Sequence, residues 1–424
     1  METTDEPVEL VERVAALDLG KAGLVGCVRV PYEDLPGRRR QEVREYLTLS
    51  RSLLELADWL RCERVELVVM EATSDYWKPV YYLLEAEGFT CWLLNAKHVK
   101  NVPGRPKTDK LDAVWLAKVA ERGMCSPSLV HPKPIRQLRD LVRYRRSLIR
   151  ERTREKQRVE KLLEDAQIKL SSVISDIFGV SGREMLAALV AGQRSPKVLA
   201  QMAQGRMRSK TAVLEEALTG HFEDHHGFLL QAMLDHVDAL TAQVEAVSTR
   251  VEAVIAPFSH DAQRFDEITG VGLTAAQELI AEIGVDVTRF PSAAHLVSWA
   301  KFAPIEKSSA GKKRGGSTGK GNPWLAGTLG EVVASVSRTK TFLGERYRRL
   351  VRHIGKSRAI VAVGNSILKI IWHLLANPET RYHDLGPDHY QSKLNTRRRE
   401  RDLIRQLERL TGKKVTLAPT PTAA

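Results

Sequence analysis

Four carboxylates in the first third of the chain have the type and spacing to hold metal ions. Asp18 follows the apolar run VAAL and Glu71 follows the apolar run LVVM, so both acids are expected at the ends of buried strands. Asp109 and Asp112 lie three apart in KTDKLDA, at the start of a predicted helix, and share one helix face. Carboxylates are the hard oxygen ligands that Mg²⁺ prefers, and paired metal ions suit phosphoryl transfer. For either helix aspartate alone, a helix N-cap or first-turn acid is the alternative.

A second candidate is the segment KSSAGKKRGGSTGKGN at 307–322. It holds five Lys/Arg, five Gly and four Ser/Thr but no carboxylate, a composition that suits phosphate binding. A nucleotide P-loop requires G-x-x-x-x-G-K-[ST], and here Arg314 replaces the first glycine and Gly321 replaces the hydroxyl residue. The segment therefore predicts no ATP or GTP site, and a flexible basic loop is the alternative to a functional one.

The elements expected around the four acids define an α/β domain. RVAALDLG and LVGCVRV predict two strands of a hairpin that turns between Gly20 and Gly23, and residues 41–60 are expected to form a helix. VELVVMEA and TCWLLNA predict further strands, with helices over VYYLLEAEG and DKLDAVWLAKVAERG. This order predicts a mixed sheet packed between helices.

Long helical runs follow the α/β region. Residues 138–170 lack Pro and Gly, and residues 171–225 are expected to be helical with interruptions. A further run has the a/d pattern of a coiled coil at Val237, Leu240, Val244, Val247, Val251 and Val254. We expect the two long helices to pair as an antiparallel hairpin, within the chain or between two copies. Gly270 and Gly272, in ITGVGLTAAQELIAEIG, predict either a helix-hairpin-helix that contacts phosphate or a plain helix turn.

The chain as a whole is basic. Its 424 residues, 43% of them hydrophobic, suffice for two or three domains, and Lys and Arg outnumber Asp and Glu by 65 to 52. The excess is concentrated, because residues 131–161 hold twelve Lys/Arg against four Asp/Glu, and a second basic run covers 393–414. Concentrated charge indicates a polyanionic partner, with a solvated surface as the alternative.

The cysteines and the N-terminal segment indicate the cellular compartment of the protein. Cys27, Cys62, Cys91 and Cys125 are widely spaced and lack metal-site spacing, so reduced, buried thiols are predicted. The N-terminus METTDEPVEL carries early acids and no apolar segment, and no apolar run reaches membrane-spanning length. We therefore expect a soluble cytoplasmic protein with no membrane partner.

The order of the motifs resembles one known family. ALDLGK, VMEATSDYW and KTDKLDA, followed far along the chain by SSAGKKRGG and TGKGNPWL, resemble the DEDD transposases of insertion-sequence family one-ten over nearly the whole chain. These are bridge-RNA-guided recombinases with a RuvC-like N-terminal domain and a separate C-terminal transposase domain. The resemblance implies a bacterial, nucleoid-associated enzyme whose partners are donor and target DNA, a structured guide RNA, and further copies of itself in a dimer or tetramer.

The resemblance also implies roles for individual residues. The catalytic and metal-binding acids would be Asp18, Glu71, Asp109 and Asp112, with Mg²⁺ or Mn²⁺ as the cofactor. The nucleophile would be Ser309, and Ser308 is the alternative because Ala310 stands where the family commonly has glycine. Nucleic-acid contacts are expected from the polar residues beside these motifs, namely Lys107, Lys110, Lys307, Lys312, Lys313, Arg314, Lys320 and Asn322.

The expected organisation is a multidomain α/β plus α protein. It comprises an RNase H/RuvC-like mixed-sheet catalytic domain (8–127), a basic coiled-coil linker and dimerisation region (131–260), a mainly helical C-terminal transposase domain with the serine loop (261–390), and a basic, partly disordered tail (391–424). The leading hypothesis is RNA-guided DNA cleavage and strand exchange through a covalent phosphoserine, with the serine and the acids meeting within one subunit or across a dimer. A RuvC-like junction-resolving nuclease that uses metal and water is the alternative, and a non-catalytic nucleic-acid scaffold is a third possibility.

Overall fold

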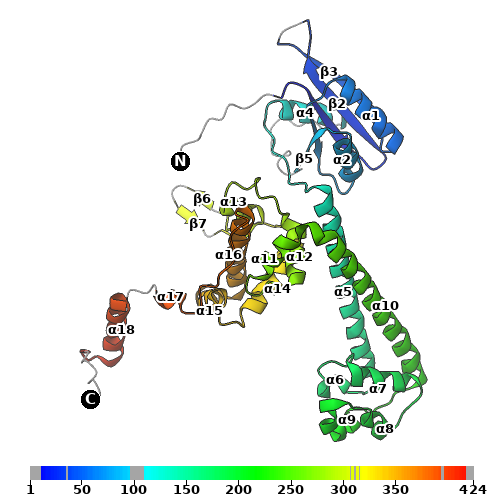
Figure 1. Ribbon diagram of the computed structural model, residues 1–424, viewed down its shortest axis with the longest axis vertical. Helices are drawn as coiled ribbons and strands as arrows, with labels where there is room; N and C mark the ends of the chain where they lie inside the picture. The colour runs from blue at the N-terminus through cyan, green and yellow to red at the C-terminus, as the bar shows by residue number, and fades with distance from the viewer. Residues whose placement is uncertain are drawn as a thin grey trace. The chain divides into compact units, whose positions relative to one another are not determined.

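The computed structural model describes residues 11–34, 37–95, 109–305, 307–309, 312–314, 316–392 and 396–416. At 109, 307–309, 312–314, 391–392 and 396–399 the description covers the backbone alone. The chain divides into two compact units, Met1–His131 and Pro132–Ala424. The first unit is built on a mixed sheet, and the second is almost wholly helical (Figure 1). This is the predicted combination of α/β and helical regions.

A five-stranded sheet forms the centre of the first unit. Its strand order is β3-β2-β1-β4-β5. The strands are β1 (Val14–Leu19), β2 (Gly23–Pro31), β3 (Arg39–Leu47), β4 (Leu67–Glu71) and β5 (Thr90–Leu94). β1 and β2 form the predicted hairpin, β3 extends it in antiparallel fashion, and β4 and β5 run parallel to β1. Because β1 and β4 are parallel neighbours, they end at the same edge of the sheet.

Helices cover both faces of this sheet. α1 (Ser50–Cys62) and α2 (Trp77–Ala86) pack on the face that carries Leu17 and Met70. α4 (Asp109–Glu121) packs on the opposite face, which carries Ala16 and Val69. Side chains alternate between the faces along a strand. The residues that follow Leu17 and Met70, which are Asp18 and Glu71, therefore belong to the α4 face.

The predicted helix over 41–60 is wrong in its first part. Residues up to Leu47 form β3, and α1 begins only at Ser50. β3 is an edge strand held by pairing with β2 and by contacts with α1: the Arg44 guanidinium lies 4.7 Å from the centroid of the Trp59 ring, and Tyr46 packs on the same ring. These contacts are tertiary, so a charged segment with little apolar periodicity does not reveal them.

All four cysteines are free thiols, but they are not all buried. Cys27 is buried, Cys91 and Cys125 are half-buried, and Cys62 is exposed, so the prediction of burial is wrong for Cys62. Burial raises the pKa of Cys27 to about 11 and that of Cys91 to about 12. Those thiols are therefore protonated at neutral pH, which makes them poor nucleophiles and poor metal ligands.

The second unit begins with a long helical hairpin. α5 (Lys133–Asp165) and α10 (Asp224–Ile255) lie side by side (Figure 1). Among the predicted seam positions, Val237, Leu240 and Val251 are buried and the other three are half-buried. Pairing within the chain therefore covers the apolar seam that the heptad pattern predicts.

A small helical head joins the two arms of the hairpin. Its elements are α6 (Leu170–Val173), α7 (Val180–Val190), α8 (Pro196–Gln201), the 3-10 helix η1 (Gly205–Lys210) and α9 (Thr211–Ala217). Leu163 of α5, Leu186 of α7 and Leu230 of α10 share one buried core. The predicted interruptions within 171–225 correspond to the turns of this head.

A helical bundle completes the second unit. Its elements are η2 (Ala256–Phe258), α11 (Ser259–Asp266), α12 (Leu273–Ile283), α13 (Ala293–Trp299), β6 (Lys307–Ser309), β7 (Lys312–Arg314), α14 (Pro323–Val336), α15 (Phe342–Ile354), α16 (Lys356–Ala376), α17 (His389–Ser392) and α18 (Thr396–Thr411). α16 packs against α13, α14 and α15. The tail therefore contains a helix, and its last residues, 417–424, lie outside the described residues.

The prediction that no apolar run reaches membrane-spanning length is wrong for one helix in the described part of the chain: α16 is long and apolar enough to cross a membrane by length and composition. Val363, Ile367 and Ile371 are fully buried within the bundle. A core helix of a folded domain satisfies the same criteria, and this packing accounts for the apolar composition of α16.

Candidate active site

Asp18 and Glu71 are neighbours at the sheet edge where β1 and β4 end. The parallel register pairs Leu17 with Met70, so the next residues on each strand are these two acids, on strands about 4.8 Å apart. Glu71 is buried with 6% exposure, and Asp18 is half-buried. Two like charges on adjacent strands of one face repel each other unless a cation or donor lies between them.

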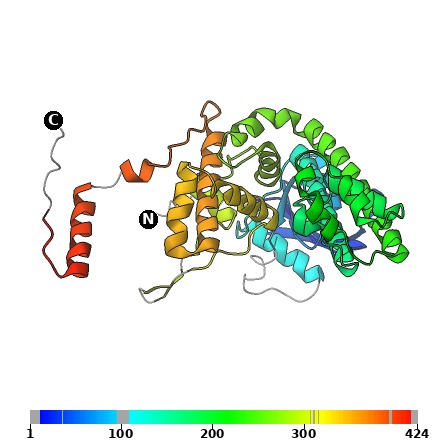
Figure 2. The same ribbon diagram turned by 90° about the horizontal axis from the view of Figure 1, so that it is seen from below.

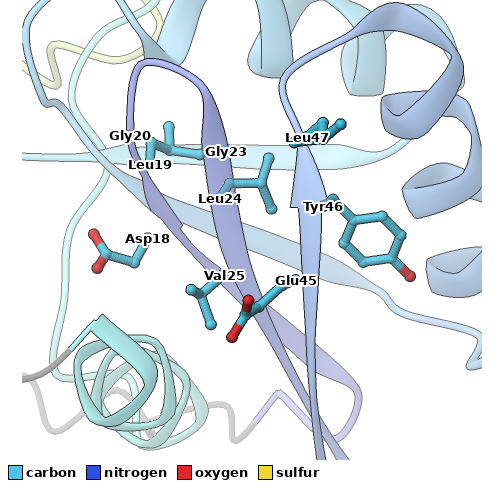
Figure 3. A pocket seen from close by; sticks show the side chains of 9 residues that line it. All are labelled: Asp18, Leu19, Gly20, Gly23, Leu24, Val25, Glu45, Tyr46 and Leu47. Atoms are coloured by element: carbon cyan, nitrogen blue, oxygen red, sulfur yellow. The ribbon is translucent and has the colours of Figure 1, made fainter.

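We call Asp18 and Glu71 the acid row; a third acid, Glu45, which was not predicted from the sequence, lies beside it on the same face. Asp18 pairs with Val25 on β2, and Val25 pairs with Glu45 on β3. Asp18 and Glu45 also line one pocket (Figure 3), together with Leu19, Gly20, Gly23, Leu24, Val25, Tyr46 and Leu47. Glu45 was not predicted because its segment was expected to form a helix, and the alternation of side chains along a strand was therefore not considered there.

The first turn of α4 lies over this row. Lys110 Nζ forms an ion pair with Glu45 at 2.8 Å, and this pair raises the pKa of Lys110. Asp112 follows on the same turn and is half-buried. Asp109 begins α4, but its side chain lies outside the described residues. The structure therefore brings Asp18, Glu71 and the start of α4 to one end of one sheet face.

This arrangement suits a divalent cation in its donor chemistry. The carboxylates lie on two adjoining strand ends and at one helix start. Carboxylate oxygens are the hard ligands that Mg²⁺ and Mn²⁺ prefer. Among the described side chains, no group of three or more His, Cys, Asp or Glu is arranged to hold a metal ion. Asp109, the remaining acid of the predicted set, has its side chain outside the described residues.

The basic segment forms a two-stranded ribbon. Ser308 pairs with Lys313 and Ser309 with Lys312, between β6 and β7. Below the ribbon, Ile305 N–H donates to the Ser317 carbonyl at 3.2 Å and closes its base. The base also requires Gly316, because a Cβ there would stand 1.7 Å from the Ile305 carbonyl oxygen. The base of the hairpin is therefore fixed by a backbone hydrogen bond and by a close approach that only glycine allows.

The predicted contact residues of this segment are placed only in part. The side chains of Lys307, Ser308, Ser309, Lys312, Lys313 and Arg314 lie outside the described residues, as does the whole of Lys107. Lys320 is exposed. Their roles remain predictions.

Asn322, predicted to contact nucleic acid, makes two hydrogen bonds within the fold. Its Oδ1 accepts a hydrogen bond from Trp324 N–H at 3.0 Å, which caps α14, and its Nδ2 donates to Glu282 at 2.5 Å. Arg143 donates two hydrogen bonds to the same carboxylate, both at 2.8 Å. Burial alone raises the pKa of Glu282, but the Arg143 and Asn322 hydrogen bonds outweigh it and hold that pKa below its usual value. The ribbon therefore leads into a helix start that is fixed to α5.

A second buried ion pair lies one turn further along α5. Arg146 donates to Glu278 of α12 at 2.5 Å and to the Thr328 hydroxyl of α14 at 2.7 Å. It also contacts Glu331 of α14. We call these contacts, with those of Arg143 and Glu282, the arginine network. Part of the basic run predicted to face a polyanion is therefore used to join α5, α12 and α14.

Trp324 is also held by arginine side chains. The guanidinium groups of Arg143 and Arg150 lie 5.5 and 5.1 Å from its ring centroid. These cation–π contacts strengthen the junction between α5 and the start of α14.

The turn between α11 and α12 requires glycine. Gly270 has a φ of +83°, and a Cβ there would stand 2.5 Å from the Val336 side chain. Gly272 is the N-cap residue of α12 and is exposed. The geometry is that of two helices joined by a tight glycine turn, which is the feature common to both predicted alternatives.

Comparison with known proteins adds independent findings. Residues 17–168 match the family model of the IS110 DEDD domain, described as a transposase, and residues 262–348 match the transposase family IS116/IS110/IS902. The transposase for insertion sequence element IS1111A from Coxiella burnetii (strain RSA 493 / Nine Mile phase I) is 25% identical over 326 residues, which cover 75% of this chain and 79% of that protein. The first match contains all four predicted acids, and the second contains the ribbon. The chain belongs to the IS110 family of insertion-sequence transposases, enzymes that recombine DNA.

Proposed function

We propose that this transposase cleaves and joins DNA with Ser309 as nucleophile and a metal-dependent acid site in a RuvC-like domain. The observation that carries the acid site is the register of β1 and β4, which sets Asp18 beside Glu71 on the face covered by α4. Asp109 and Asp112 complete the proposed set, and Mg²⁺ or Mn²⁺ bound there supplies Lewis-acid stabilisation of charge on phosphate oxygens.

The proposed chemical step is a transesterification at phosphorus. The Ser309 hydroxyl attacks the scissile phosphate, a P–O bond to serine forms, and the bond to the leaving sugar oxygen breaks. The serine proton passes to a carboxylate base, and the leaving oxygen takes up a proton. Attack by the sugar hydroxyl of another strand reverses these changes and releases the serine, so strand exchange needs no ATP. Lys312, Lys313 and Arg314 provide positive charge for the transition state.

The proposed partners are donor and target DNA and a structured guide RNA, with the enzyme acting as a dimer or tetramer. Support for DNA comes from the family, and support for a polyanion also comes from the net charge of +13. A guide RNA would supply sequence choice by base pairing, while the protein binds backbones. Recovery of one defined RNA with the purified protein is expected, and its absence from an active preparation would contradict this part.

The covalent step is tested by trapping the protein on DNA. Purified protein with its co-purifying RNA and Mg²⁺ is incubated with labelled DNA that carries the element junction, and adducts are resolved on a denaturing gel. We expect an adduct that is lost in Ser309→Ala and retained in Ser308→Ala. An adduct that is lost only in Ser308→Ala would show that Ser308, and not Ser309, is the nucleophile. Cleavage without any adduct, dependent on Asp18 and metal, would establish a water-using nuclease instead.

A further inference from the structure

A run of unbalanced positive charge lies where α15 meets α16. Residues 346–358, RYRRLVRHIGKSR, contain six Lys/Arg and no Asp or Glu. The two helices lie side by side (Figures 1 and 2), and Gly355, with a φ of +79°, joins them. We call residues 352–358 the basic turn. It lies beyond residue 348, where the second family match ends.

The first three arginines of the run have roles within the fold. Arg346 donates to the Tyr390 hydroxyl at 3.2 Å, and the Arg349 guanidinium lies 4.1 Å from the centroid of the same ring. Arg348 donates to the Thr339 carbonyl at 2.8 Å and pairs with Glu345 at 3.1 Å. These contacts hold α15 to its neighbours, so structure alone explains these three residues.

The three cations of the basic turn have no such role. Arg352, Lys356 and Arg358 are exposed, and none of them makes a hydrogen bond or an ion pair within the described part of the chain. Arg352 lies in the last turn of α15, where a cation complements the helix dipole. Lys356 and Arg358 lie in the first turn of α16, where the dipole opposes a cation and where no acid is present. Folding therefore gains nothing from these two charges.

We propose that the basic turn binds the phosphate backbone of duplex DNA. A phosphate beside these side chains relieves their mutual repulsion and releases condensed counterions. Residues 352–358 include no Asn, Gln, Trp or Tyr, so the turn lacks the amide and large aromatic groups that read or stack on bases. Contacts to phosphate carry no sequence information, so we expect equal binding to duplexes of unrelated sequence. This inference rests on the family's action on DNA, and it is independent of the proposed nucleophile and metal site.

The test is the salt dependence of DNA binding by the full chain. Arg352→Gln/Lys356→Gln/Arg358→Gln is compared with the unchanged protein on two duplexes of unrelated sequence. Each phosphate contact contributes about 0.9 to the slope of log K against log salt, so the triple variant is expected to lose about 2 to 3 from that slope. We expect its affinity to fall by about tenfold or more at low salt, equally on both duplexes.

A matched control removes three exposed cations elsewhere. Lys197→Gln/Arg206→Gln/Arg208→Gln changes the net charge by the same amount on the helical head, and those side chains are also exposed. We expect its slope to stay within about 1 of the unchanged protein. Equal losses in both triple variants would show a net-charge effect and overturn the proposal.

Two more measurements distinguish duplex binding from RNA binding and from the chemical step. Loss of RNA binding with DNA binding intact in the triple variant would overturn the proposal in favour of an RNA surface. Ser309→Ala is expected to bind both duplexes normally, so failure of the proposed chemistry does not affect the result. Thermal unfolding shows whether each variant is folded. If the triple variant misfolds, Lys356→Gln alone replaces it, with an expected loss of about 1 in the slope of log K against log salt.

Discussion

Charged side chains are arranged in opposite ways in the two units. In the first, Asp18 and Glu71 carry the same sign at the ends of adjacent strands. In the second, Arg146 and Glu278 carry opposite signs, are both at least 90% buried and are joined by a hydrogen bond. The arginine network pairs opposite charges inside the fold, whereas the acid row brings two like charges together, which is the arrangement of the proposed metal site.

The largest effect on folding is expected from breaking the arginine network. Arg146→Ala leaves Glu278 buried without its cation, which typically costs about 3–5 kcal/mol in the free energy of unfolding. Denaturant unfolding measures it. The matched control is Arg154→Ala, an exposed arginine on the same helix, which should change stability by less than about 0.5 kcal/mol. A cost below about 1 kcal/mol for Arg146→Ala would show that the network is not needed for stability.

A smaller, pH-dependent effect is expected at Glu282. Arg143 and Asn322 hold the pKa of its carboxyl below 4.5 in the folded state, although burial opposes them. A group with a lowered folded pKa contributes stability that is complete above its unfolded pKa and is lost as the pH falls through the folded one. Glu282→Gln is expected to cost about 1.5–3 kcal/mol at pH 7 and to lose stability less steeply below pH 4.5. Parallel stability curves for the two proteins would contradict this.

The reactivity of two cysteines tests whether the α4 face of the sheet excludes water. Cys27 lies buried on the α4 face of β2, and burial raises its pKa to about 11. At pH 8 we expect the exposed Cys62 to react with iodoacetamide roughly a hundredfold faster than Cys27. Mass spectrometry of labelled peptides gives both rates, with urea-unfolded protein as the reference. Equal rates in the folded protein would mean that the sheet face is open to water.

The sequence predicts the acid row because local pattern alone defines it. An apolar run that ends in one carboxylate places Asp18 and Glu71 at strand ends, and the structure has both there. Glu45 escapes prediction because the segment around it is charged and becomes a strand only by pairing with β2.

The arginine network escapes prediction for a different reason. Its partners are more than 130 residues apart, as in Arg146 with Glu278 and Arg143 with Glu282. A count of charges along α5 therefore overstates the positive charge left for a nucleic acid. Local counting cannot show which arginines are neutralised by acids from distant helices.

The claim that the acid row serves chemistry and not folding is tested most directly by Asp18→Asn. Two quantities are measured on this variant: the free energy of unfolding and Mg²⁺-dependent cleavage of element-junction DNA. We predict stability within about 0.5 kcal/mol of the unchanged protein, because the amide has the shape of the carboxylate it replaces and the side chain is only half-buried. We predict that cleavage is lost. Cleavage that persists at the normal rate, or a variant that is strongly destabilised, would contradict the account.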